Sequence, residues 1–141
     1  MILPDVNLLV YAYNSDAPRH AAARRWWEGL LNGAMPVGLP WAVTCGFVRL
    51  MTHPAVLVRP LSTAEAGAAV QAWLDRPCGE GLGPGPRHLE ILLRLLAEPG
   101  VTGALTTDAH LAALAIEHQC ELHSNDADFS RFPGLRWRNP L

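Results

Sequence analysis

Ile2-Leu3-Pro4-Asp5-Val6-Asn7 opens the chain as a short apolar run that ends in an acid and passes into a helical stretch over 8–13. A carboxylate at the end of an apolar strand is costly to desolvate and gains little from turn chemistry. In an open parallel α/β sheet, the ligand crevice lies beyond the carboxyl ends of the strands. We therefore predict that the first strand delivers Asp5 to such a crevice.

Three further aspartates stand where a predicted strand stops or a predicted helix starts. Asp108 opens the segment DAHLAALA, and Asp126 and Asp128 follow Leu122-His123-Ser124, a strand candidate. A parallel sheet can bring these acids and Asp5 to one place, where clustered carboxylates raise one another's pKa unless a cation neutralises them. Mg²⁺ prefers oxygen ligands and is commonly held by one or two carboxylates plus phosphate oxygens. The pattern therefore predicts a divalent-metal pocket that polarises a phosphate and activates water.

Each of the three later acids also has a purely structural interpretation. Asp108 could cap its helix by accepting hydrogen bonds from free backbone N–H groups. Asp126 or Asp128 could close a turn through a hydrogen bond from the backbone to the side chain, and for Asp128 we favour that interpretation. Asp5 is the acid that a structural role explains least.

Strand and helix candidates alternate along the rest of the chain. Asp16-Ala17-Pro18 is typical of a helix start, and Ser62-Thr63-Ala64-Glu65 is a capping box that predicts a helix over 62–75. Glycine and proline residues over 76–87 predict an irregular loop. Alanines on one side of the helix predicted over 108–118 permit close packing against a neighbour. The other predicted elements are strands over 35–39, 120–124 and 135–137 and helices over 19–32, 43–51 and 91–97.

This alternation predicts a single α/β domain over residues 1–141 with a mostly parallel sheet. Pro4 is awkward in a central strand, because proline cannot donate a hydrogen bond to a neighbouring strand. We therefore expect a bulge or the end of strand pairing at Asp5.

Composition limits the classes of function. The formal charge of −2 argues against a protein that holds nucleic acid by overall charge alone, so local patches of its eleven cationic residues, all arginine, would have to do so. Three cysteines without a CxxC pair argue against a thiolate zinc site. No apolar stretch reaches the roughly 18 residues of a membrane helix, and the amino terminus does not resemble a signal peptide. We predict a cytoplasmic protein, and the 50% hydrophobic content favours an oligomer or a partner surface.

Several segments together resemble the PIN-domain ribonucleases, specifically the VapC toxins of bacterial toxin–antitoxin modules. They are DVNLLVYAY, FVRLMTHP, PGPRHLEILLRLL, DAHLAALAIEH and SNDADFSRFPGLRW, and they span nearly the whole chain. The resemblance implies a PIN-like three-layer fold with a central, mostly parallel sheet of roughly four to five strands flanked by helices. It also implies a homodimer, an acidic Mg²⁺ or Mn²⁺ site that cleaves RNA endonucleolytically, and a cognate antitoxin that blocks the cleft.

The resemblance assigns roles residue by residue. Asp5 and Asp108 match the two most diagnostic metal ligands, and Asp126 matches the later acid, with Asp128 beside it. Two polar positions next to the site are matched by Asn7 and Ser124.

One departure from the family pattern concerns the second β-to-α passage. Many members place a glutamate three residues before the arginine that corresponds to Arg49, and this chain has Gly46 there. Glu90 could substitute, although a solvated surface position suits a glutamate better. The histidines and tryptophans near these segments are interpreted as packing residues. The candidate RNA contacts are Arg49, Arg87, Arg131, Arg136 and Arg138.

The predicted function is a Mg²⁺-dependent endoribonuclease toxin that hydrolyses phosphodiester bonds in structured RNA such as tRNA or rRNA. Asp5 and Asp108 would hold the metal, and Asp126 would complete the pocket. Gly46 motivates an alternative, a PIN-like module that binds RNA or protein without catalysis. A second alternative is a phosphatase of the haloacid dehalogenase type, but that family needs another aspartate at the position of Asn7 and commonly a lysine, which this chain lacks.

Overall fold

The structure, a computed structural model, describes residues 1–141 and alternates strands with helices as the sequence predicts. Its elements are β1 (Ile2–Pro4), α1 (Val6–Tyr13), α2 (His20–Leu31), β2 (Val37–Pro40), α3 (Trp41–Met51), α4 (Thr63–Leu74), β3 (Gly79–Leu82), α5 (His88–Leu96), α6 (Leu105–Glu117), β4 (Glu121–His123), the 3-10 helix η1 (Ala127–Arg131) and β5 (Trp137–Arg138). None of the helices has the length and apolar character needed to span a membrane.

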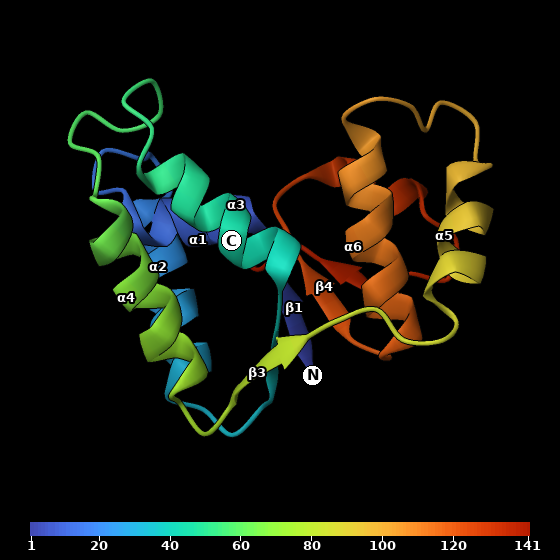
Figure 1. Ribbon diagram of the computed structural model, residues 1–141, viewed down its shortest axis with the longest axis horizontal. Helices are drawn as coiled ribbons and strands as arrows, with labels where there is room; N and C mark the ends of the chain where they lie inside the picture. The colour runs from blue at the N-terminus through green and yellow to red at the C-terminus, as the bar shows by residue number, and fades with distance from the viewer.

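The five strands form one sheet in the order β3-β2-β1-β4-β5, with every neighbouring pair parallel (Figure 1). The predicted α/β class is therefore confirmed, and the sheet is wholly parallel. The first strand of the chain occupies the centre, where Leu3 lies opposite Leu122 of β4. Both residues are fully buried. This order puts the carboxyl ends of β1 and β4 side by side.

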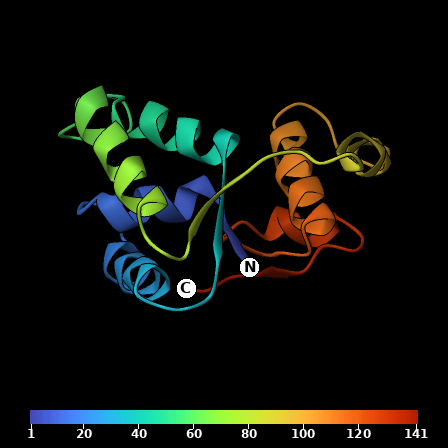
Figure 2. The same ribbon diagram turned by 60° about the horizontal axis from the view of Figure 1, so that its bottom comes forward.

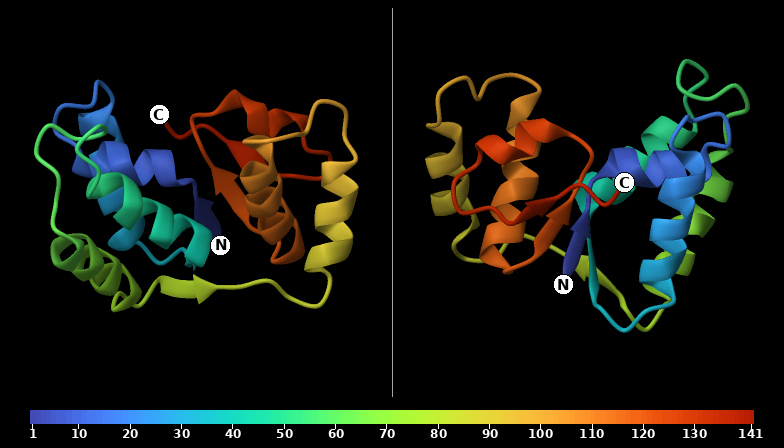
Figure 3. Two further views of the ribbon diagram at one scale, coloured as in Figure 1. Left: turned by 45° about the horizontal axis from the view of Figure 1, so that its top comes forward. Right: turned by 180° about the vertical axis from the view of Figure 1, so that it is seen from behind.

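The helices divide into two groups on the two sides of β1 (Figures 1 and 2). Helices α1 to α4 form the first group, in which α1 packs on α2 and α3, and α3 packs on α4. Helices α5 and α6 pack on each other and form the second group together with η1. The view from behind shows that the chain runs toward the first group after β5 and that the C-terminus lies near α1 (Figure 3).

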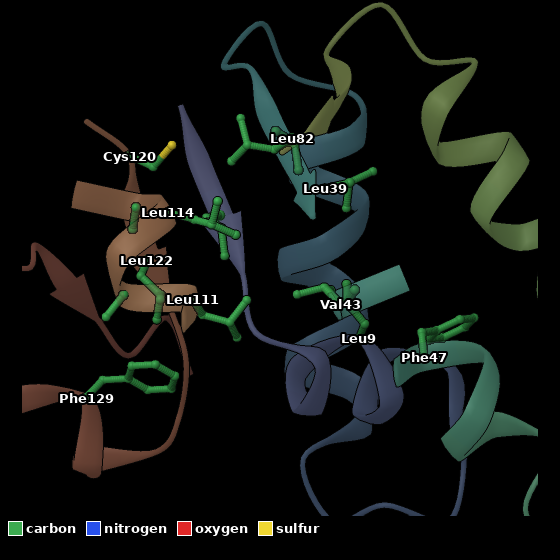
Figure 4. Packing of buried hydrophobic residues seen from close by; sticks show 14 of the residues in the cluster. Leu9, Leu39, Val43, Phe47, Leu82, Leu111, Leu114, Cys120, Leu122 and Phe129 are labelled. Carbon is green, nitrogen blue, oxygen red and sulfur yellow. The ribbon is translucent and has the colours of Figure 1, made fainter. Parts of the chain in front are cut away.

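Buried apolar side chains from both groups pack around the sheet, such as Phe47 on one side and Phe129 on the other (Figure 4). The first holds an aromatic cluster in which the ring of Trp73 lies 4.6 Å from that of Phe47 and 5.3 Å from that of Trp27, measured between centroids. The second is built on α6, whose alanines 109, 112, 113 and 115 are fully buried. Small side chains let a helix approach its neighbours closely, as predicted for this segment.

Three boundaries differ from the sequence prediction. The stretch over 76–87 contains β3, which pairs with β2 at the edge of the sheet, so the prediction of an irregular loop there is wrong. The helix predicted over 19–32 is present as α2 (His20–Leu31), but its N-cap is Arg19 and not Asp16, because residues 14–17 form a turn closed by Asn14. Helix α6 begins at Leu105, one turn before Asp108.

Candidate active site

Asp5 lies at the carboxyl end of the central strand, where the sequence predicts it. β1 ends at Pro4, which lies opposite His123 of β4, so the proline occupies the last paired position. The backbone N–H of Asp5 then donates to the carbonyl oxygen of His123 at 2.8 Å. The Asp5 residue is only 5% exposed, and α1 starts directly after it. A nearly buried carboxylate is thus fixed between two parallel strands.

Ser124 connects Asp5 to the acids that follow β4. Its hydroxyl donates to Asp5 Oδ2 at 2.8 Å and accepts the backbone N–H of Asp126 at 3.0 Å. Asp126 Oδ1 in turn accepts the backbone N–H of Asp128 at 2.9 Å and caps η1. Asp128 is exposed and pairs with Arg131 at 3.3 Å. The turn-closing role that we favoured for Asp128 is therefore wrong, since Asp126 performs it.

Asp108 approaches from the second group of helices. It lies in the first turn of α6 and does not cap that helix, whose N-cap position is Ala104. Burial, together with the charges of Asp5, Asp126 and Asp128, raises the pKa of Asp108 to about 6, while the charge of Arg131 opposes the shift. The four predicted acids therefore share one electrostatic environment.

The pKa of Asp5 is shifted in the same direction. Burial raises it most, and the charge of Asp126 adds to the rise. The hydroxyl of Ser124 and the backbone N–H groups of Val6 and Asn7 act in the opposite direction. Because burial disfavours the charged form of a carboxylate, both Asp5 and Asp108 would be ionised more readily with a cation beside them.

The donor set suits a hard divalent cation. No three His, Cys, Asp or Glu side chains converge as a complete metal-ligand group. Mg²⁺ does not require such a group, because it keeps several waters and is commonly bound through one or two carboxylates and substrate phosphates. Asp5 and Asp108, both destabilised as anions, are the carboxylates that would bind it, with Asp126 next to them.

The other predicted site residues differ in whether they affect Asp5 and Asp108. Asn7 is exposed on α1, and only its backbone N–H affects Asp5. The charge of Arg131 lowers the pKa of Asp108. Arg49 lies on α3 beside α4, and Arg87 pairs with Glu90 at 3.5 Å on the exposed start of α5. Glu90 is not among the charges that shift Asp5 or Asp108.

Position 46 is next to the site and carries no acid. A Cβ built on Gly46 would meet Val6 Cγ2 at 3.4 Å, an ordinary contact with the residue that follows Asp5. The side of the pocket that faces α3 therefore lacks the carboxylate that many PIN-domain proteins have there.

A hydrogen-bond network that no sequence pattern indicated lies behind the site. His123 is buried, and its Nδ1 accepts the indole N–H of Trp26 on α2 at 3.0 Å. Its Nε2 lies 2.8 Å from Glu121 Oε1. The indole N–H of Trp137 donates to the carbonyl oxygen of Ser124 at 3.1 Å. These partners are up to 97 residues apart in the chain, beyond the reach of any local pattern.

A second histidine pair lies on the far side of α6. His88 Nε2 is 3.0 Å from His110 Nδ1, and His88 Nδ1 lies 4.0 Å from Glu117 Oε1. Glu117 also accepts the backbone N–H groups of Gly85 and Arg87, each at 2.8 Å. This cluster ties the segment before α5 to α6 and does not act on the acids.

Comparison with known proteins agrees with this arrangement. Residues 2–135 match the PIN domain family. The chain is 47% identical to ribonuclease VapC33 of Mycobacterium tuberculosis over 141 residues, covering 100% of this chain and 99% of the relative. It is 42% identical to ribonuclease VapC37 of the same organism over 140 residues, covering 99% and 97%.

Solved structures share the fold at low sequence identity. A crystal structure of VapBC2 from Rickettsia felis, bound to a DNA fragment from its promoter, has a TM-score of 0.71 at 19% identity and covers 99% of this chain and 98% of that one. M. tuberculosis VapC20, a toxin that cleaves the sarcin-ricin loop, has a TM-score of 0.70 at 19% identity, with coverage of 96% and 99%. These matches exclude the phosphatase alternative. The chain belongs to the PIN-domain family and, within it, to the VapC ribonucleases.

Proposed function

We propose that this protein is a metal-dependent endoribonuclease toxin in which Asp5 and Asp108 hold Mg²⁺ or Mn²⁺, Asp126 completes the pocket and Asp128 lies at its rim. The observation that carries the proposal is the buried carboxylate of Asp5 at the carboxyl end of β1, held by the Ser124 hydroxyl at 2.8 Å, in a chain 47% identical to a ribonuclease. A divalent cation bound there would polarise the scissile phosphate and lower the pKa of a bound water.

The three acids have different tasks in this proposal. Asp5 is fixed by Ser124 and by the backbone of β4, so its carboxylate keeps one position. Asp108 is half-buried and presents its carboxylate from α6. Asp126 uses Oδ1 to hold η1, which leaves Oδ2 to orient the attacking water. Such fixed placement before reaction is what makes positioned charges effective in catalysis.

Arginines around the acids would position the RNA backbone. Arg131 is the best placed, because it already pairs with Asp128 and acts on Asp108. An arginine fork binds phosphate oxygens as well as it binds a carboxylate, so Arg131 can exchange one partner for the other. Arg49 and Arg87 would contact more distant phosphates. The substrate would be a structured RNA such as tRNA or rRNA, and mapping of cleavage sites in total RNA would identify it.

Substitution of single acids tests the proposal. Asp5→Asn and Asp108→Asn should each reduce RNA cleavage by about 10²-fold or more, the scale on which single catalytic groups act. Both should weaken Mn²⁺ binding measured by calorimetry. Asp16→Asn, at an exposed aspartate outside the site, is the matched control and should change neither. Equal cleavage by wild type and Asp5→Asn would exclude the proposed active site.

A second candidate, a catalytically weakened PIN-like module that binds RNA or protein, is favoured by Gly46. A Cβ at this position would make an ordinary contact with Val6, the residue after Asp5, so we expect Gly46→Glu to add a carboxylate on this side of the site. If the site is catalytic but poor in acids, this variant should bind Mn²⁺ more tightly and keep or increase its cleavage rate. Absence of Mn²⁺ binding and cleavage in both wild type and Gly46→Glu would favour the binding module.

We also propose that a cognate antitoxin binds and neutralises the protein; a toxin–antitoxin complex from Klebsiella pneumoniae is among the solved structures that share the fold. An apolar groove of about 370 Å³ between α3 and α4 is lined by Trp41, Val48 and Val70, among others, and Trp41 is 68% exposed. It suits an apolar antitoxin segment. Overexpression should arrest growth, and coexpression of the antitoxin should restore it. Trp41→Asp should keep RNA cleavage and lose that protection.

A homodimer is proposed from the exposed face of α5. Leu89 and Leu93 are 64% and 57% exposed one turn apart, with Glu90 and Arg94 beside them. Antiparallel pairing of two α5 helices about a twofold axis would bury the leucines and place Glu90 opposite Arg94 of the second copy. Sedimentation should show a dimer that Leu93→Glu dissociates. The cytoplasmic location and the single domain over 1–141 stay predictions.

A further inference from the structure

Two tryptophan side chains donate hydrogen bonds to consecutive residues at the end of β4. Trp26, on α2, donates its indole N–H to His123 Nδ1 at 3.0 Å. Trp137, on β5, donates its indole N–H to the Ser124 carbonyl oxygen at 3.1 Å. The first tryptophan belongs to the first group of helices, and the second belongs to the edge of the sheet. The two bonds therefore hold the end of β4 from different directions.

His123 and Ser124 are also the two residues that hold Asp5. The His123 carbonyl oxygen accepts the Asp5 backbone N–H at 2.8 Å, and the Ser124 hydroxyl donates to Asp5 Oδ2 at 2.8 Å. One residue thus fixes the backbone of Asp5 and the other fixes its carboxylate. His123 is 4% exposed and Ser124 is fully buried, so water is not available to replace either contact.

The bond from Trp26 also determines the tautomer of His123. An indole N–H can only donate, so Nδ1 of His123 must be an unprotonated acceptor. The ring proton therefore lies on Nε2, which donates to Glu121 Oε1 at 2.8 Å. Both ring nitrogens are satisfied, and the ring orientation is fixed. The same logic applies to metal sites, where a partner on one ring nitrogen orients the histidine for its task at the other end.

We propose that Trp26 and Trp137 are positioning residues that hold Asp5 in place through His123 and Ser124. Neither tryptophan touches the acids, and each acts through one intermediate residue. The importance of the arrangement for catalysis rests on the proposed function, because it depends on Asp5 being a metal ligand. The arrangement itself does not, and it is testable in the metal-free protein.

Three matched substitutions test the proposal. Trp26→Phe and Trp137→Phe keep one six-membered aromatic ring and remove the pyrrole ring with its N–H, a loss of volume that Trp73→Phe reproduces. Trp73→Phe is the control, because the indole N–H of Trp73 is also hydrogen-bonded, at 2.8 Å to the Tyr13 hydroxyl, but far from Asp5 in the chain and in the fold. Each protein is compared by urea unfolding, by NMR of the Asp5 amide and the His123 ring nitrogens without metal, and by Mn²⁺ calorimetry.

We expect wild-type His123 to show the neutral tautomer with its proton on Nε2, and Trp26→Phe to lose this preference. Both Trp26→Phe and Trp137→Phe should shift the Asp5 amide resonance and weaken Mn²⁺ binding by roughly 10- to 100-fold, the usual cost of losing an outer-shell partner. RNA cleavage should recover partly at high Mn²⁺. Trp73→Phe should lower only the unfolding midpoint.

Two results would overturn the proposal. One is a wild-type His123 ring with its proton on Nδ1, which needs no variant to detect. The other is a set of Trp26→Phe and Trp137→Phe proteins that lose stability as Trp73→Phe does while the Asp5 resonance and the Mn²⁺ affinity stay unchanged. Failure of wild type to bind Mn²⁺ or cleave RNA would instead count against the proposed function, and the NMR measurements would still decide on the two tryptophans.

Discussion

The two groups of helices on either side of β1 pack with different side chains. The first group fills its interior with the rings of Tyr13, Trp27, Phe47 and Trp73, whereas α6 in the second group presents a run of buried alanines. Large rings bury much apolar surface and dominate stability. Alanines contribute less burial but let the α6 backbone lie close to the sheet. The first group therefore has the larger aromatic core, and the second carries Asp108 on the closely packed α6.

The largest expected effect is loss of the aromatic cluster. Trp73 is 1% exposed, and Trp73→Ala should lower the free energy of unfolding by about 3–5 kcal/mol, as truncation of a buried aromatic residue does. If the two groups have separate tasks, the folded fraction should keep the Mn²⁺ affinity of wild type. Urea unfolding and calorimetry measure both quantities. Trp41→Ala, at an exposed tryptophan, should leave the unfolding free energy nearly unchanged.

Overpacking of α6 should reduce RNA cleavage more, and stability less, than Trp73→Ala does. Ala112 is fully buried, so Ala112→Leu should cost about 1–3 kcal/mol of stability and push α6 away from its neighbours. RNA cleavage per folded molecule should then fall more than it does in Trp73→Ala, because Asp108 moves with the helix. Ala64→Leu, at an exposed alanine of α4, is the control. Normal cleavage by folded Ala112→Leu would show that α6 does not need its close approach.

A smaller effect is expected from helix capping, which differs between α4 in the first group and α6 in the second. Ser62 and Glu65 form a complete capping box at the start of α4, so Ser62→Ala should lower the unfolding free energy by about 1 kcal/mol without affecting cleavage. At the start of α6, Ala104 has helical dihedral angles, φ −59° and ψ −27°, and a cap residue requires an extended backbone. Ala104→Ser should therefore give no comparable gain in thermal unfolding.

The smallest effect concerns pH, because Asp108 is partly exposed and solvent screens its interactions. The pKa of Asp108 is raised from 3.8 to about 6 in the folded protein, so folding favours the protonated form. Its contribution to stability is complete below about pH 4 and is lost as the pH rises through about 6. The difference in unfolding temperature between metal-free wild type and Asp108→Asn should therefore change over this interval. A constant difference would contradict the pKa shift.

Local signals were sufficient for the elements that determine their own structure. The capping box predicted α4 because Ser62 and Glu65 satisfy backbone groups within one turn. The alternation of strands and helices predicted the parallel sheet, and the acid at the end of the first apolar run predicted the place of Asp5. The relation of Asp5 to Asp126 followed from the same rule about strand ends, whereas Asp108 reaches the site from the first turn of α6.

Elements that depend on a distant partner could not be predicted in this way. Half of β3 is glycine, and the segment is a strand only because it pairs with the edge of β2. The spacing of Asp126 and Asp128 does not distinguish which one closes the turn. The tryptophans were interpreted as packing residues, because nothing in their spacing indicates that Trp26 meets His123 or that Trp137 meets Ser124.

The central place of β1 has a consequence for synthesis of the protein in the cell. β1 pairs with β4, and Ser124, which donates to Asp5, follows that aspartate by 119 residues in the chain. The central strand and its carboxylate therefore acquire these partners only after the chain as far as Ser124 has been made.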